Sequence, residues 1–330
     1  MKGGIVKIIT LEEGYLTQSV LKFFGDSSRS DEYTLKTSAA LAGTDVIEAY
    51  LDLGEGRIAA MDEAEIDMQV LSFSAPQIAD VEVAIQVMTE ANNEAAKAVK
   101  KYPSRFAAFA ALPAVDPKAA VAEFERALTK LGFVGGFICG TVNGEFLDDK
   151  KYWPIFECAE AHNAPVYLHP YFPLPSLMQT YFRGREELSA PVWGFMVDAS
   201  CHFLRLLTSG VFDNFPKLKI ILGHLGESIP YNLDRINSRL SAFVQEKKLR
   251  KSPADYVRDN LVITTSGNFS PQSVLCAIST IGVDNILFSV DWPNESNKIA
   301  VEFLTHLPIG KTDLEKIAYK NAERVLGLKQ

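Results

Sequence analysis

Four ionisable side chains stand at the ends of short apolar runs, where distant parts of the chain could meet. They are Glu12, His169, His224 and Asp291, and two of them belong to a set of only five histidines. Two carboxylates and a neutral imidazole suit a divalent cation that keeps coordination positions open for water or substrate. The pattern therefore predicts a catalytic rather than a structural metal site.

Each of these residues also has a simpler explanation. Glu12 could be a solvated loop residue, and Glu13 beside it is a competing carboxylate. His169 could be a core histidine, and Asp291 could cap the helix that follows it. His202, in a helical pattern, is expected to be an interior histidine. The metal-site interpretation depends on the fold bringing the four side chains together.

His224 and Glu227 are three residues apart, where an apolar run passes into a helical pattern. At this spacing the carboxylate reaches one ring nitrogen, fixes the tautomer and leaves the other nitrogen facing the pocket. That arrangement is typical of an oriented general acid or base. A plain hydrogen bond at the start of a helix is the alternative.

Short apolar or β-branched runs recur along the chain with helical patterns between them. We expect eight buried parallel strands, at Ile5–Leu11, Met68–Phe73, Phe106–Leu112, Val134–Gly140, Pro165–His169, Leu218–Gly223, Leu261–Ser266 and Ile286–Asp291. This alternation indicates an α/β protein, and eight units favour a closed (β/α)₈ TIM barrel. The C-terminal ends of the strands then meet on one face, where barrel sites are built.

We expect one barrel domain over residues 1–330, because no repeat or linker divides the chain. The first run leads into Leu11-Glu12-Glu13-Gly14 without a G-x-G-x-x-G motif, so a dinucleotide-binding sheet is excluded. Long loops at residues 14–50 and 171–195 follow strands 1 and 5. They are expected to cover or line the pocket.

The composition limits the kinds of partner. The chain has 33 Lys and Arg against 41 Asp and Glu, a net charge of −8, and no basic run, so nucleic acid is not expected as a partner. The longest apolar run, Phe106–Val115, is too short to cross a bilayer, so no membrane partner is expected. Four cysteines without a C-x-x-C pair favour a reducing, cytoplasmic location.

Three segments carry a resemblance to a known family: FPKLKIILGHLGE at 215–227, TTSGNF at 264–269 and ILFSVDWP at 286–293. With shorter matches they cover essentially the whole chain. The sequence resembles the decarboxylase branch of the amidohydrolase superfamily, which includes γ-resorcylate, 2,3-dihydroxybenzoate and aminocarboxymuconate-semialdehyde decarboxylases. The resemblance implies a small aromatic carboxylic acid as substrate and a homodimer or homotetramer.

The resemblance also implies roles for the residues selected above. Glu12, His169 and Asp291 match the family's metal-ligand positions, and His224 with Glu227 matches its catalytic pair.

One position departs from this ligand pattern. The family's Glu-x-His after the first strand is Glu12-Glu13-Gly14 here, so one imidazole ligand is absent. One divalent cation is still implied, and the oxygen-rich set makes Mg²⁺ or Mn²⁺ competitive with Zn²⁺.

Six further residues are expected to contact the substrate: Phe24, Cys139, Tyr171, Phe172, Arg235 and Asn294. Cys139, Tyr171 and Asn294 replace the family's Asn, Arg and Phe, and this changes the polar groups that the substituents of a ring would meet. Arg235 could instead be a surface or subunit-contact residue, and the aromatic residues could be packing.

The resemblance implies non-oxidative decarboxylation of a hydroxybenzoate, reversible to carboxylation of a phenol. Asp291 is expected to give a proton to the ring carbon, and His224 to hold the second oxygen or act as the alternative proton relay. A metal-dependent hydrolase of a lactone or amide and an inactive barrel that acts as a binding protein are the alternatives. Cys139 stands at the end of the fourth strand, where superfamily hydrolases often have a carboxylated Lys, and this disfavours a two-metal hydrolase.

Overall fold

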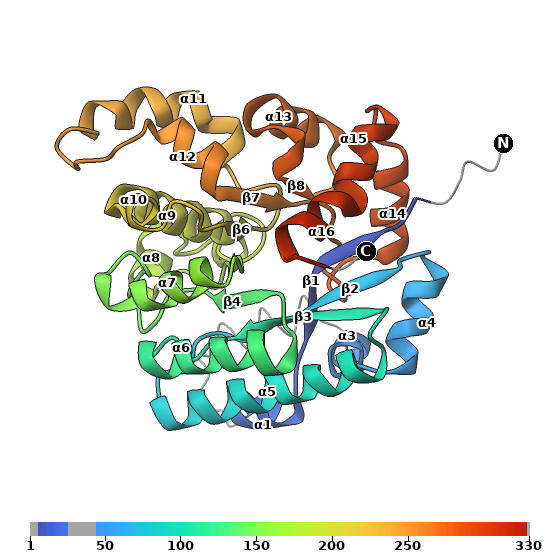
Figure 1. Cartoon of the computed structure of the whole chain (residues 1–330). Coiled ribbons are helices and arrows are strands. Elements are labelled where there is room, and N and C mark those ends of the chain that lie inside the picture. Colours follow the sequence, from blue (N-terminus) through green and yellow to red (C-terminus); the bar gives the residue numbers. More distant parts are fainter. Residues whose placement is uncertain (1–5, 26–43, 329–330) are drawn as a thin grey trace.

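The computed structural model describes residues 6–25 and 44–328, with side chains at 6–23 and 46–328. Its strands are parallel and follow one another in chain order: β1 (Ile9–Tyr15), β2 (Met68–Phe73), β3 (Phe106–Ala111), β4 (Gly135–Cys139), β5 (Val166–His169), β6 (Ile220–Leu222), β7 (Leu261–Thr264) and β8 (Ile286–Leu287). A parallel bridge between Leu11 and Ser289 joins the chain after β8 to β1 and closes the sheet. The predicted (β/α)₈ barrel is confirmed (Figure 1).

Helices surround the strands in Figure 1. In the described residues they are α1 (Gln18–Gly25), α3 (Thr44–Leu51), α4 (Glu55–Glu63), α5 (Val81–Lys101), α6 (Pro117–Arg126), α7 (Trp153–Ala161), α8 (Pro175–Tyr181), α9 (Gly194–Ser209), α10 (Val211–Asn214), α11 (Ile229–Leu240), α12 (Pro253–Asn260), α13 (Pro271–Ile281), α14 (Asn297–Thr305), α15 (Lys311–Glu315) and α16 (Asn321–Leu326). The described part of the chain contains no helix with the length and apolar character needed to span a membrane.

The strands are buried on both faces, which explains why they appear in the sequence as continuous apolar runs. One cluster of apolar side chains lies between the strands and the helices, and a second fills the barrel. Inside the barrel the rings of Phe109, Phe137 and Tyr167 lie 5.2–6.5 Å apart, centroid to centroid. Tyr167 therefore points along the barrel interior.

The first strand differs from its predicted span. It runs from Ile9 to Tyr15 instead of Ile5–Leu11, and Ile5 is outside the described residues. The register against β2 shifts between Thr10 and Glu13, as it does at a β-bulge. Because the apolar pattern does not reveal a bulge, Glu12 was expected after the strand, whereas it lies inside it.

The eighth strand is shorter than predicted. Its ladder with β7 covers only Ile286 and Leu287, and the N–H of Phe288 donates to the carbonyl of Ile317 instead of a strand. Asp291 therefore stands on the connection after the strand and not at its last position.

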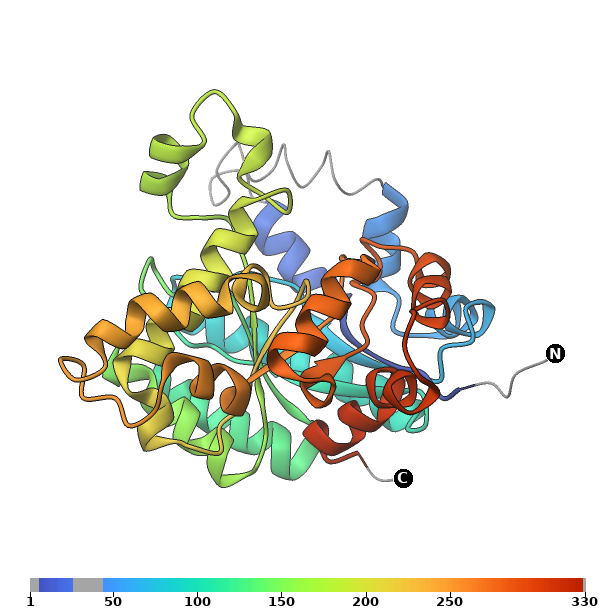
Figure 2. The same ribbon diagram turned by 90° about the horizontal axis from the view of Figure 1, so that it is seen from above.

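The two connections predicted as loops contain helices. The one after β1 holds α1 and α3, and the one after β5 holds α8. Figure 2 shows the segment between β5 and α9 protruding from the body of the barrel. Both connections leave the C-terminal ends of their strands, so they stand on the predicted face.

His202 is an interior histidine of α9, as predicted. It is 1% exposed, and its Nε2 accepts the N–H of Leu147 at 2.9 Å. Burial, with a smaller effect of Arg205, lowers its pKa from 6.5 to about 3. The folded protein therefore keeps this ring neutral at pH values where the unfolded chain would protonate it.

This difference predicts a loss of stability in acid. Below pH 6.5 the unfolded state binds a proton that the folded state does not, so the free energy of unfolding falls as the pH decreases. At pH 5 the His202 contribution is about 2 kcal/mol relative to pH 7. Urea unfolding of wild type and His202→Gln at both pH values measures it. An equal loss in both proteins would contradict the assignment.

Candidate active site

Glu12 is a buried carboxylate held by three hydroxyl groups. Tyr167 and Ser266 donate short hydrogen bonds to its Oε2, and the Oγ1 of Thr264 lies 3.3 Å from the same oxygen. The second oxygen, Oε1, is buried and accepts no hydrogen bond from the described residues. The barrel thus fixes Oε2 by hydrogen bonds, whereas Oε1 remains able to bind a positively charged group.

Two imidazoles face the unpartnered oxygen of Glu12. The Nε2 of His169 lies 3.0 Å from Oε1, and the Nε2 of His224 lies 3.6 Å from it. His169 Nδ1 is 2.6 Å from the carbonyl oxygen of Pro170, and His224 Nδ1 is 2.7 Å from Oε1 of Glu227. When the rings are neutral, these acceptors hold the proton on Nδ1 and leave both Nε2 lone pairs facing the centre of the cluster.

Asp291 adjoins this cluster. Its Oδ2 lies 3.8 Å from His224 Nε2, and its Oδ1 accepts a hydrogen bond from the side chain of Asn294 at 3.2 Å. The donors that lie within 4.8 Å of one another belong to Glu12, His169 and His224. The compact donor set therefore contains His224, and Asp291 stands beside it.

Burial and charge act in opposite directions in the cluster. Burial opposes the charge of Glu12, but His224 and His169 outweigh it and lower the pKa of this carboxyl to about 2. Burial also opposes protonation of His224, but Glu227 and Glu12 raise its pKa well above the usual range. Burial raises the pKa of Asp291, and the neighbouring His224 opposes the increase. Positive charge at the centre is thus strongly favoured.

The cluster fits a divalent cation. With neutral imidazoles, the carboxylates of Glu12, Glu227 and Asp291 would leave uncompensated negative charge in a buried site, which is costly. The orphaned Oε1 of Glu12 and the two Nε2 lone pairs are the donors that such an ion accepts. The outer partner on each Nδ1 is the usual support of a metal-binding histidine.

Two residues of the cluster and the adjoining Asp291 have left-handed backbone conformations. The φ angles are 61° at Glu12, 51° at His224 and 76° at Asp291. For residues other than glycine this region costs about 1–3 kcal/mol each, and such conformations gather at functional sites. The backbone conformation that orients these side chains thus reduces the stability of the fold.

Gly14 leaves no room for the imidazole that the family pattern has at this position. A Cβ at Gly14 would lie 2.5 Å from Cε1 of Tyr50 and 2.8 Å from Oγ of Ser74. The Tyr50 hydroxyl donates to Oδ1 of Asn294 at 3.0 Å. A tyrosine from α3 therefore fills the space and connects to Asp291 through Asn294.

The structure brings some of the predicted substrate-binding residues to the cluster. Cys139 ends β4 with its Sγ 3.5 Å from His169 Nδ1, and Asn294 contacts Asp291 as described. Tyr171 and Phe172 follow β5 with their ring centroids 5.2 Å apart. These four positions surround the ends of three different strands.

One predicted substrate-binding residue has no contact with the cluster, and the side chain of another is not described. Arg235 is exposed on α11, and within the described residues no hydrogen bond or ion pair links it to the cluster. The side chain of Phe24 is outside the described residues.

Several supporting residues were not singled out from the sequence. Tyr167, Thr264 and Ser266 hold Glu12, and the spacing of Thr264 and Ser266 at the end of a buried strand is the signal that could have identified them. Asp198 on α9 is 5% exposed, and burial raises its pKa to about 7, with a further increase from Glu227. The sequence gives no signal for Asp198, because a single Asp in a helical pattern is normally an exposed surface residue.

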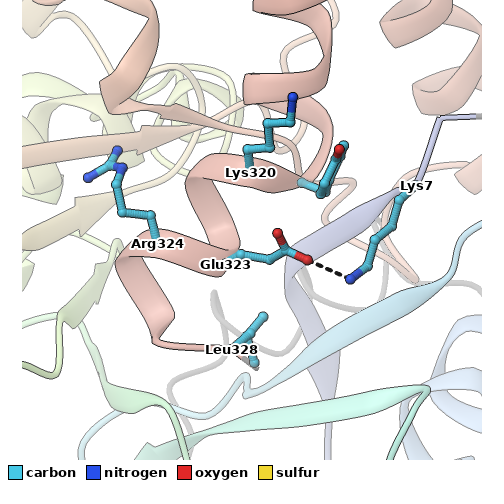
Figure 3. Close-up of a pocket in the computed structure, with 6 residues that line it drawn as sticks. Lys7, Lys320, Glu323, Arg324 and Leu328 are labelled. Carbon is cyan, nitrogen blue, oxygen red and sulfur yellow. Dashed lines mark hydrogen bonds and ion pairs between the residues drawn. The ribbon is translucent and has the colours of Figure 1, made fainter. Parts of the chain in front are cut away.

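A pocket of about 600 Å³ lies at the other end of the barrel (Figure 3). Lys7, just before β1, pairs with Glu323 of α16 at 2.6 Å, and Lys320 and Arg324 lie nearby. None of the residues predicted to do chemistry lines this pocket. The pocket lies at the N-terminal ends of the strands. In TIM barrels this face contributes to stability, whereas the active site is built at the opposite face.

Comparison with known proteins agrees with this geometry. The amidohydrolase family model matches residues 46–328. A γ-resorcylate decarboxylase of Polaromonas sp. is 41% identical over 292 residues, 84% of this chain and 88% of that protein.

Solved structures extend the match to nearly the whole chain. A dihydroxybenzoic acid decarboxylase from Polaromonas sp., with bound manganese and the inhibitor 2-nitroresorcinol, is 37% identical with a TM-score of 0.88 and covers 98% of each chain. A 5-carboxyvanillate decarboxylase from Sphingomonas paucimobilis is 30% identical with a TM-score of 0.92, over 98% of this chain and 100% of that one. The chain belongs to the amidohydrolase family, in the branch of the γ-resorcylate and related aromatic-acid decarboxylases.

Proposed function

We propose that this protein is a metal-dependent, non-oxidative decarboxylase of a hydroxybenzoate-type acid, with γ-resorcylate as the first substrate to test. The observation that supports it is the buried, unpartnered Oε1 of Glu12, 3.0 and 3.6 Å from the Nε2 atoms of His169 and His224. The relatives with γ-resorcylate or dihydroxybenzoate in their names are 36–41% identical.

Non-oxidative decarboxylation replaces a carbon–carboxylate bond with a carbon–hydrogen bond. The electron pair of the broken bond passes into the ring, carbon dioxide leaves, and the ring carbon takes a proton. A divalent cation, when bound, orients the carboxylate and the adjacent phenol oxygen and stabilises their negative charge. Glu12, His169 and His224 would hold it, with Asp291 adjoining.

The chain's own groups would handle the proton. Asp291, fixed through Asn294, stands at the edge of the cluster and is the proton donor to the ring carbon in this proposal. Glu227 orients His224 through Nδ1, so the Nε2 that faces Glu12 is left for the cation. The aromatic pair Tyr171 and Phe172 would pack against the substrate ring.

Carbon dioxide release from a panel of acids tests this function. Metal-stripped enzyme is supplied with Mn²⁺, Zn²⁺ or Mg²⁺ and given 2,6-dihydroxybenzoate, 2,3-dihydroxybenzoate, salicylate or 5-carboxyvanillate. We expect metal-dependent release that is fastest with 2,6-dihydroxybenzoate. A folded enzyme that releases nothing from any acid with any of these metals would overturn the proposal.

Glu227→Gln is expected to lower kcat/KM about 10- to 100-fold, the usual effect of removing a partner that orients an essential histidine. The amide keeps the size of the side chain but loses the charge that holds His224 Nδ1–H. Steady-state kinetics measure the change, with Asp234→Asn, an exposed acid on α11, as the matched control. Equal losses in both variants would reject the orienting role.

The proposed enzyme is a homo-oligomer. Large apolar side chains are exposed on the segment after β5 and on α11, including Tyr181 (72%), Trp193 (55%) and Tyr231 (83%), which is typical of a surface covered by another subunit. Light scattering of wild type and Trp193→Lys tests the assembly, and a monomeric wild type would reject it.

The proposed location is the cytoplasm. All four cysteines are free, as expected in a reducing compartment.

A further inference from the structure

A second group of metal-binding side chains lies on the outside of the barrel. Glu125 on α6, Cys158 on α7 and His162 after α7 place a carboxylate oxygen, a sulfur and an imidazole nitrogen within 4.8 Å of one another. The two helices pack together and lie side by side in Figure 1. The three residues are at or near the helix ends that lead into β4 and β5, so this group is at the end of the barrel opposite Glu12.

The sequence itself places two of the donors together. Cys158 and His162 are four residues apart, and the N–H of His162 donates to the carbonyl of Cys158 at 3.2 Å, so helical geometry stacks the two side chains on one face. His162 is the C-cap of α7. The C-terminal end of a helix carries partial negative charge, which favours a cation there.

The three side chains are available for a ligand. Within the described residues none of them takes part in a hydrogen bond or ion pair. The neighbouring arginine, Arg126, is already engaged by Glu123 at 2.7 Å. Among the described residues, Glu125 thus has no cationic side chain paired with it.

The environment of Cys158 argues against a reactive thiol. The residue is 6% exposed, and burial, followed by the charge of Glu125, raises its pKa to about 11. Without a cation the sulfur therefore keeps its proton, whereas reactive cysteines have lowered pKa values.

We infer that Glu125, Cys158 and His162 form a Zn²⁺ site that clips α6 to α7, separate from the active site. Thiolate, imidazole and carboxylate are the three ligand types that Zn²⁺ accepts, with bond lengths of about 2.0–2.3 Å. Glu125 and His162 are exposed, so small rotations of their side chains close the remaining distance. On binding, the thiol proton goes to solvent and a sulfur–zinc bond forms, with water in the fourth position and no change of oxidation state.

Cobalt substitution of the full-length protein tests the site. Metal-stripped enzyme is titrated with Co²⁺, and a thiolate-to-cobalt charge-transfer band is followed in the near ultraviolet. The active-site donors Glu12, His169 and His224 contain no sulfur, so they do not produce this band. We expect the band in the wild type, bleaching on addition of Zn²⁺, and a second equivalent of bound metal.

The variants separate this site from other thiols and from folding defects. Cys158→Ala should abolish the band, and Glu125→Gln and His162→Asn, both at exposed positions, should weaken Zn²⁺ binding at least about tenfold while carbon dioxide release stays unchanged. Glu157→Gln, an exposed acid next to Cys158, is the matched control and should behave as wild type. No band in the wild type, a band that survives Cys158→Ala, or a band lost only in Cys139→Ser would overturn the inference.

Discussion

Asp291→Asn is expected to lower kcat/KM for γ-resorcylate by about 10²- to 10⁴-fold, the range that a positioned proton donor contributes. The ring carbon needs a proton as carbon dioxide leaves, and an amide cannot supply one. The substitution keeps the size of the side chain and can keep the contact with Asn294 at 3.2 Å. Steady-state release of carbon dioxide measures the effect.

Metal content separates the two roles that the sequence assigned to Asp291. Since the compact donor set is Glu12, His169 and His224, Asp291→Asn should retain the bound metal while it loses activity. Loss of the metal together with activity would make Asp291 chiefly a ligand. Activity within about tenfold of wild type would remove it from the proton-transfer step.

Glu12→Gln is expected to weaken metal binding more than 100-fold, beyond the range for an outer partner, and to reduce carbon dioxide release in parallel when metal is limiting. The change removes the charge of the one oxygen that faces both imidazoles and accepts no hydrogen bond within the described part of the chain. Metal titration monitored by activity and by elemental analysis gives both quantities.

Two further variants calibrate this result. Tyr167→Phe removes one of the hydroxyls that fix the carboxylate and should cost about 10- to 100-fold in metal affinity. Glu63→Gln, exposed on α4, should change nothing. If Glu12→Gln binds metal as tightly as wild type, the cation is not held by this cluster.

Most residues of the candidate site could be predicted from the sequence for a simple reason. In a parallel barrel all C-terminal strand ends meet on one face, so polar residues that follow buried runs converge. His169 and His224 were found in this way, and the three-residue spacing of His224 and Glu227 predicted their 2.7 Å contact. Arg235 was selected by spacing along a helix, but it is exposed, because helical spacing does not define which way a surface helix turns its side chains.

The choice between Glu12 and Glu13 needed the structure. Both are buried, but a bulge in β1 directs Glu12 to the imidazoles, whereas Glu13 accepts the N–H groups of Val290 and Trp292 at 3.0 and 3.2 Å. Two adjacent carboxylates normally point to opposite faces of a strand. The left-handed φ of Glu12 changes that alternation, and no local pattern marks it.

The sequence by itself determined the order of eight buried strands, the face on which the candidate site lies and most of the ionisable groups there, because apolar periodicity and strand-end position are local properties. The tertiary structure decided what those groups contact. Tyr167 and Ser266 reach Glu12 across 155 and 254 residues of chain, and Tyr50 fills the space beside Gly14. Such contacts depend on the register between strands and on packing across the barrel, which are set only when the sheet closes.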